Sequence, residues 1–94
     1  MIRHIVLWSF RPGTEAQREE FLSGLQALDG VIPEIRRMEI RRSCVPGGTY
    51  QACLIADFDD LDALDRYKHD PRHVAVSSLC KSIRDTRAAI DFAL

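Results

Sequence analysis

The polar residues singled out as candidates for chemistry are few: His4, Tyr67, His69, Asp70, His73 and Asp91. His73 follows Asp70 and Pro71, a pair typical of a helix start, and the amino end of a helix disfavours a charged imidazolium. We therefore expect a neutral His73 that can accept a proton. Tyr67 lies on the inner side of the preceding predicted helix and is expected to point into the same space. Asp91 is an acid on an otherwise apolar strand, so we expect it to have a polar partner, His73 or His4.

Other motifs of known chemistry are absent from the sequence. It contains no G-x-G-x-x-G, no Walker loop, no G-x-S-x-G and no H-E-x-x-H. Cys44, Cys53 and Cys80 are odd in number and lack the spacing of a C-x-x-C pair or a zinc site. Cys53 lies inside a strand pattern and Cys80 inside a helix pattern, so we interpret them as small core residues, with a nucleophilic role as the less favoured alternative. No metal and no cofactor are expected, and His69, on a polar hinge, is expected to be solvated.

Length and composition restrict the class of protein. With 94 residues, the chain is expected to form one domain over residues 1–94. A formal net charge of -1 argues against a general nucleic-acid binder, which would be clearly basic. No apolar run approaches the roughly 20 residues that span a bilayer, and the start does not look like a signal peptide. We expect a cytoplasmic protein that binds neither nucleic acid nor a membrane.

Two segments are predicted to be central strands because both of their faces carry apolar residues. In residues 2–10, rich in β-branched and aromatic side chains, one face carries Val6 and Trp8 and the other carries Ile5 and Leu7. Residues 50–58 follow the same pattern. A strand that is apolar on both faces needs cover on both sides. Helices can cover one side in so short a chain, so a second copy of the chain is the expected cover of the other.

The remaining elements alternate in a recognisable order. A capping box of Thr14 and Gln17 predicts a helix that ends before Gly30. Residues 35–42 and 86–93 are predicted strands. Asp59 or Asp60 is expected to start a short helix with Leu61, Leu64 and Tyr67 on its inner side, and a helix from Pro71 carries Val76, Leu79, Cys80 and Ile83 on its inner side. The order predicts an α+β, ferredoxin-like βαββαβ fold with its second helix split and a four-stranded antiparallel sheet.

Short segments spread over nearly the whole chain resemble one known family. They are His4-Ile5-Val6-Leu7 with Phe10, Ile32-Pro33, Phe58 with Leu61, Leu64 and Tyr67, Asp70-Pro71-Arg72-His73, and Ile90-Asp91-Phe92. On these segments the chain resembles the stress-responsive dimeric A/B barrel family. The resemblance implies a homodimeric α/β barrel in which the open sheet face of each protomer packs on its twin. In that dimer the second protomer would bury the side chains of Ile5, Leu7, Cys53, Ile55, Ile90 and Phe92.

One branch of this family contains the plant olivetolic acid cyclase, which closes a tetraketide ring by aldol condensation without a metal. That resemblance implies four catalytic residues: His73 as the base, Asp91 to orient it, and Tyr67 and His4 to complete the site. An imidazole base, a carboxylate that holds it in one tautomer and a phenol that hydrogen-bonds a developing oxyanion suit enolate chemistry. A small apolar or polyketide-like ligand would lie between sheet and helices. The residues expected to bind it are Val6, Trp8, Phe21, Leu54, Val76 and Leu79.

Several positions depart from the cyclase pattern and favour a different substrate. Asp70 and Ala52 stand where the cyclase has histidines, Arg87 stands where it has an apolar pocket residue, and the sequence leaves open whether Trp8 fills the cavity. The catalytic hypothesis predicts that His73 and Asp91 lie within hydrogen-bond reach beside a cavity. The alternatives are a non-catalytic stress-response or scaffold dimer, and a dimer that acts as a monooxygenase, as other ferredoxin-like dimers do.

Overall fold

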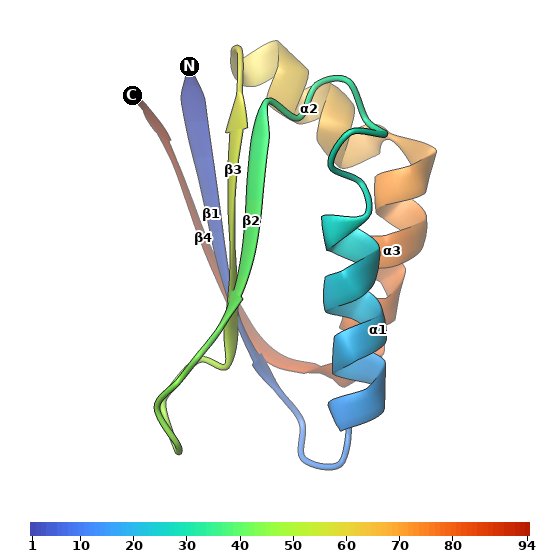
Figure 1. Cartoon of the computed structure of the whole chain (residues 1–94), viewed down its shortest axis with the longest axis vertical. Coiled ribbons are helices and arrows are strands. Elements are labelled where there is room, and N and C mark those ends of the chain that lie inside the picture. The colour runs from blue at the N-terminus through green and yellow to red at the C-terminus, as the bar shows by residue number, and fades with distance from the viewer.

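The computed structural model describes residues 1–94 and has the predicted ferredoxin-like α+β fold. Its strands form one four-stranded sheet in the order β2-β3-β1-β4, and each neighbouring pair is antiparallel. Three helices lie on the same side of the sheet, and the other side carries no helix (Figure 1). The strands are β1 (Ile2–Phe10), β2 (Arg37–Arg42), β3 (Ala52–Phe58) and β4 (Arg84–Ala93), and the helices are α1 (Glu15–Gln26), α2 (Leu61–His69) and α3 (Pro71–Ile83).

The core lies between the sheet and the helices. The inward faces of the central strands β1 and β3 contribute Val6, Trp8, Leu54 and Phe58, all buried. From the helix layer, Phe21 of α1 packs edge-on against Trp8, with 5.1 Å between ring centroids. The prediction that β1 and β3 are central strands is confirmed.

No helix is both long enough and apolar enough to cross a membrane.

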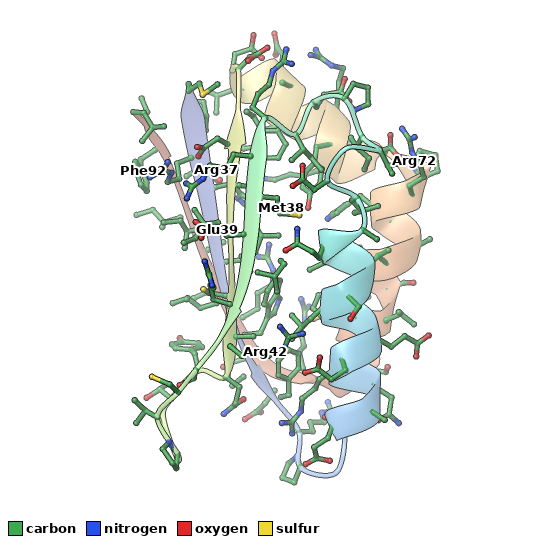
Figure 2. The ribbon with its side chains drawn as sticks, viewed as in Figure 1. Arg37, Met38, Glu39, Arg42, Arg72 and Phe92 are labelled. Carbon is green, nitrogen blue, oxygen red and sulfur yellow. The ribbon has the colours of Figure 1, made fainter.

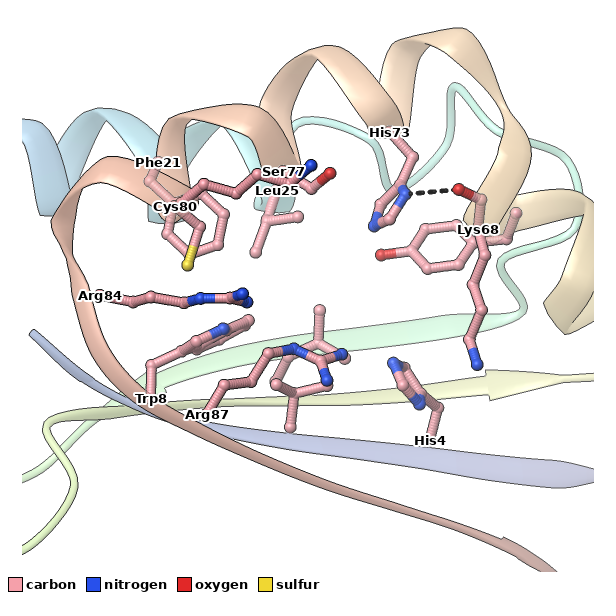
Figure 3. A pocket seen from close by; sticks show the side chains of 14 residues that line it. His4, Trp8, Phe21, Leu25, Lys68, His73, Ser77, Cys80, Arg84 and Arg87 are labelled. Carbon is pink, nitrogen blue, oxygen red and sulfur yellow. Dashed lines mark hydrogen bonds between the residues drawn. The ribbon is translucent and has the colours of Figure 1, made fainter.

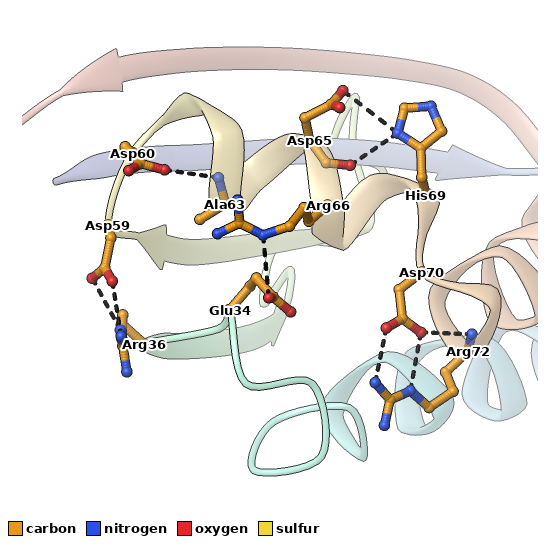
Figure 4. A network of polar contacts seen from close by, with 10 residues as sticks. All are labelled: Glu34, Arg36, Asp59, Asp60, Ala63, Asp65, Arg66, His69, Asp70 and Arg72. Atoms are coloured by element: carbon orange, nitrogen blue, oxygen red, sulfur yellow. Dashed lines mark hydrogen bonds and ion pairs between the residues drawn. The ribbon is translucent and has the colours of Figure 1, made fainter.

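Two aspartates start the helices that carry the candidate site. Asp60 accepts a hydrogen bond from the backbone amide of Ala63 at 2.8 Å, and Asp70 accepts one from that of Arg72, also at 2.8 Å (Figure 4). Pro71 takes the first turn of α3, where a missing backbone amide costs nothing. These caps fix where α2 and α3 begin, and the Asp70 cap also sets the position of the hinge between them.

Three local predictions differ from the structure. The capping box is wrong: Thr14 makes no side-chain cap, and its hydroxyl donates instead to the carbonyl of Arg11 at 2.6 Å. Its backbone is not in the extended conformation that a cap requires (φ -109°, ψ 22°). Leu61 and Leu79 are 63% and 37% exposed, so their placement on the inner sides of α2 and α3 is wrong. Strands β2 and β3 each begin two residues later than predicted, and β4 begins two residues earlier, directly after α3.

The uncovered face of the sheet, here called the open face, is apolar across its middle. Ile5 of β1 is paired with Ile55 of β3 and Ile90 of β4, so three isoleucines form a row across three strands. Ile90 is 60% exposed and Phe92 39% exposed, which is unusual for such large apolar side chains. Figure 2 shows Phe92, with Arg37 and Glu39 of β2, on this side, whereas Met38 points toward the helices. The open face therefore has an apolar centre flanked by charges.

Candidate active site

A cavity of about 300 Å³ lies between the sheet and the helices. Its volume is at the lower end of the range of small-molecule sites. Trp8, whose effect on the cavity the sequence left open, forms part of the wall and does not fill the space (Figure 3). The lining residues are His4, Val6 and Trp8 of β1, Phe21 and Leu25 of α1, Leu54 of β3, Tyr67 and Lys68 of α2, His73, Ser77, Cys80 and Lys81 of α3, and Arg84 and Arg87 of β4.

His73 is held in one tautomer by the backbone of the preceding helix. Its Nδ1 lies 3.1 Å from the carbonyl oxygen of Lys68, and a carbonyl oxygen can only accept, so Nδ1 carries the proton (Figure 3). The lone pair of a neutral ring is then on Nε2. Burial lowers the pKa of His73 below its usual value, which favours the neutral ring at pH 7. His73 can therefore act as a proton acceptor.

Tyr67 offers the cavity a free phenol. Its ring is 1% exposed and packs against Phe58 and His73, at centroid distances of 4.9 Å and 4.3 Å. The hydroxyl makes no hydrogen bond within the chain. Every polar side-chain atom that is sealed from solvent does have a partner, so the Tyr67 hydroxyl must be accessible, and the cavity that Tyr67 lines provides this access. Burial raises the pKa of Tyr67, with Arg87 opposing the shift in part. The phenol stays protonated and can donate a hydrogen bond to a ligand.

Asp91 pairs with His4 and not with His73. Its Oδ1 lies 2.5 Å from Nδ1 of His4, while the Nδ1 of His73 is bonded to a backbone carbonyl. The prediction that Asp91 lies within hydrogen-bond reach of His73 is therefore wrong. The reason is strand register: Asp91 and His4 are direct partners in the β1–β4 ladder, so their side chains emerge side by side on the same face. Asp91 is thus the structural partner of His4.

His4 is the more deeply buried of the two histidines, with 4% of its surface exposed. Burial lowers the pKa of its imidazole, and the Asp91 carboxylate offsets only part of that effect. The carboxylate accepts the proton of Nδ1, so Nε2 of the neutral ring carries the lone pair. His4 lies on the sheet side of the cavity and His73 on the helix side (Figure 3). The two imidazoles thus approach the same space from opposite walls.

The lowered pKa values predict a loss of stability in mild acid. Because folding depresses the pKa of His4 below 6.5, the unfolded chain binds a proton first, and the free energy of unfolding falls as pH drops through this interval. We expect His4 to contribute at most about 1.4 kcal/mol per pH unit there. Urea unfolding at one fixed protein concentration, repeated from about pH 5 to 8, measures the slope. His4→Gln should flatten it, whereas His69→Gln should not; equal slopes for wild type and His4→Gln would contradict the prediction.

The structure brings together four of the six residues predicted to bind substrate. Val6, Trp8, Phe21 and Leu54 line the cavity, while Val76 and Leu79 do not. Val76 faces α1 instead: a Cβ added at Gly24 would lie 3.1 Å from its Cγ1, so this contact sets the approach of α1 to α3. The assignment of the four lining residues to substrate binding stays a prediction.

Polar lining residues on α3 and β4 were not predicted, although the sequence carries a signal for them. Ser77, Lys81 and Arg84 follow His73 at intervals of four, four and three residues, which is the spacing of one helix face. This stripe lies beside the apolar one that the sequence analysis used. Burial raises the pKa of the Cys80 thiol, which disfavours the thiolate that a nucleophilic role needs.

His69 lies outside the cavity, and the chain has no cluster of metal-binding side chains. His69 is exposed, and its Nδ1 contacts the carbonyl oxygen of Asp65 at 2.9 Å on the outer side of the hinge (Figure 4). No three histidine, cysteine or acidic side chains lie close enough together to hold a metal ion. The chemistry available to these side chains is proton transfer with a ligand: the two neutral imidazoles can accept a proton, and the phenol can donate a hydrogen bond.

Solved structures share this fold over almost the whole chain. A dimeric protein of unknown function from Bacteroides fragilis, with a ferredoxin-like fold, is 28% identical over 99% of this chain and 95% of that chain, with a TM-score of 0.91. A dimeric ferredoxin-like protein of unknown function from Thermobifida fusca is 29% identical over 99% and 90%, with a TM-score of 0.87. A hydroxynitrile lyase from Passiflora edulis has a TM-score of 0.87 over 99% and 92% at 11% identity, a likeness of fold alone.

A search of curated protein sequences finds no match. The family model described as the stress responsive A/B barrel domain, in contrast, matches residues 2–94, which is nearly the full length of the sequence. The resemblance inferred from the short segments is confirmed by this match, and the fold of the two bacterial structures agrees with it. The chain therefore belongs to the stress responsive A/B barrel domain family.

Proposed function

We propose that the protein is a homodimer whose two open faces pack against each other. The row of Ile5, Ile55 and Ile90 supports this, because a lone chain would leave these side chains in water. The dimeric relatives from B. fragilis and T. fusca support it as well. The cavity lies on the other side of the sheet, so the dimer contact would leave it free to bind a ligand.

We further propose that the cavity is the site of a cyclase- or lyase-type reaction that begins with removal of a proton next to a carbonyl group. The observation that carries this proposal is the convergence of three unoccupied polar atoms on one cavity: Nε2 of His73, Nε2 of His4 and the hydroxyl of Tyr67. A neutral imidazole is an efficient general base when its pKa lies near the pH at which the enzyme works. A protonated phenol beside them can stabilise an oxyanion.

The proposed step conserves protons and electrons within the site. Nε2 of His73 takes the proton from the carbon next to the carbonyl, and the electron pair of that C–H bond moves onto the carbonyl oxygen to form an enolate. The Tyr67 hydroxyl donates a hydrogen bond to this oxygen. His4, held by Asp91, offers a second acceptor on the opposite wall. The enolate carbon then attacks a second carbonyl carbon of the substrate; the π bond of that carbonyl breaks, and its oxygen takes the proton from His73. Alternatively, the enolate carbon takes the proton back. Either outcome returns His73 to its neutral form.

Hydrogen–deuterium exchange tests this proposal without knowledge of the natural substrate. Phenylacetone, a neutral ketone small enough for the cavity, exchanges its acidic benzylic protons for deuterium through an enolate, and proton NMR in D₂O follows the loss of signal. We expect the protein to accelerate the exchange about 100-fold over the same concentration of free imidazole. A rate no faster than that of imidazole would contradict the proposal and favour a non-catalytic dimer.

A further inference from the structure

The basic side chains of this protein divide sharply into paired and unpaired ones. Of its 13 lysines and arginines, eight form ion pairs with acidic side chains. Four of the five that remain unpaired line the cavity, and the fifth, Arg11, lies outside it. Outside the cavity, every arginine except Arg11 is paired with a carboxylate. The four unpaired cations of the cavity are Lys68, Lys81, Arg84 and Arg87.

These four cations form a basic rim above an apolar floor. They come from α2, α3 and β4, while Val6, Trp8 and Leu54 of the sheet form the floor. No acidic residue lines the cavity, and the nearby carboxylate of Asp91 is bound to His4. Figure 3 shows both Arg84 and Arg87 reaching into the cavity from β4. The site therefore combines an apolar wall with positive charge that nothing in the chain neutralises.

Grouping four like charges is unfavourable unless something of opposite charge offsets it. We propose that the ligand of this cavity is an apolar molecule with one anionic group, carboxylate or phosphate, that Arg84 and Arg87 bind while its apolar body lies on Trp8 and Leu54. The planar fork of a guanidinium matches the oxygens of either anion. This inference rests on the proposed function only in taking the same cavity as the substrate site, and it adds the substrate class.

The electrostatic reach of Arg87 agrees with this assignment. Burial is the main cause of the lowered pKa values of His4 and His73, and the positive charge of Arg87 adds to the effect at both rings. The Arg87 guanidinium is thus close enough to act on both walls of the cavity. An anion bound to it would lie beside His73 and Tyr67, where the proposed proton transfer takes place.

Trp8, the single tryptophan of the chain, makes the inference directly measurable because it lines the cavity. Its fluorescence is recorded while the intact protein is titrated with phenylacetate, with phenyl phosphate and with the neutral analogue phenylacetamide. We expect at least one of the two anions to bind about tenfold tighter than the amide. Whichever anion binds tighter identifies the anionic group. Equal affinity for all three probes, or no response to any at millimolar concentration, would overturn the inference.

A matched pair of variants assigns the preference to the rim. Arg87→Gln should weaken the preferred anion about tenfold and leave the amide unchanged. Arg11→Gln, which removes the unpaired arginine outside the cavity, should change neither affinity. An anion preference that survives Arg87→Gln undiminished would overturn the inference. Because none of these probes is a ketone, their binding does not depend on catalysis. Accelerated exchange of phenylacetone without anion preference would refute this inference alone, and anion binding without exchange would refute the proposed reaction alone.

Discussion

Replacing His73 with glutamine should lower the accelerated exchange rate of phenylacetone by about 100-fold. Glutamine has a similar length and can still donate to the carbonyl of Lys68, so α2 and α3 keep their hinge. It offers no group that accepts a proton near neutral pH. Since the half-buried imidazole is the proposed base, its loss removes the proton-transfer step and leaves only the environment of the cavity. The exchange rate of the variant by proton NMR measures this effect.

The pH dependence and a second histidine variant distinguish a base from a merely structural residue. Wild-type exchange should slow as pH falls below the lowered pKa of His73, because the protonated ring cannot accept a proton. His69→Gln removes an exposed imidazole outside the cavity and should keep the full rate. If His73→Gln also kept the full rate while remaining folded, the assignment of His73 as base would be refuted.

The architecture could be predicted because strand patterns report burial on each face separately. The apolar residues on both faces of 2–10 and 50–58 placed those strands in the middle of the sheet, and the structure has them there. The helix starts at Asp59 or Asp60 and at Asp70 could be predicted for a local reason, since an aspartate before a helical pattern can cap it, and the structure selects Asp60 of the first pair. Thr14 shows the limit of such local rules: its hydroxyl found a different backbone partner.

The candidate site could be predicted only in part because it depends on strand register and helix rotation. Asp91 was recognised as an acid in need of a partner, but only the β1–β4 register decides that the partner is His4. Val76 and Leu79 fit an apolar stripe, yet the rotation of α3 turns Val76 toward α1 and Leu79 toward solvent. The basic rim combines residues of three elements, so no single stretch of sequence displays it.

Replacing Ile90 with aspartate should weaken the proposed dimer strongly. Ile90 is 60% exposed in the single chain, so an aspartate there should change the stability of one protomer little. In the proposed dimer the same side chain lies beside Ile5 in the packed open face. Two-fold symmetry would bury two unpaired carboxylates per dimer, which costs about 4 kcal/mol or more. The dissociation constant, measured by sedimentation over a dilution series, should therefore rise about 1,000-fold.

Leu61 supplies the matched control for this variant. It is 63% exposed, close to Ile90, but it lies on α2 and outside the open face. Leu61→Asp introduces the same charge at the same degree of exposure and should leave the dissociation constant unchanged. If both variants weakened the dimer equally, added negative charge in general, and not the open face, would be responsible. If Ile90→Asp dimerised as tightly as wild type, the copies would have to meet through another surface, and the apolar row of the sheet would need a different partner.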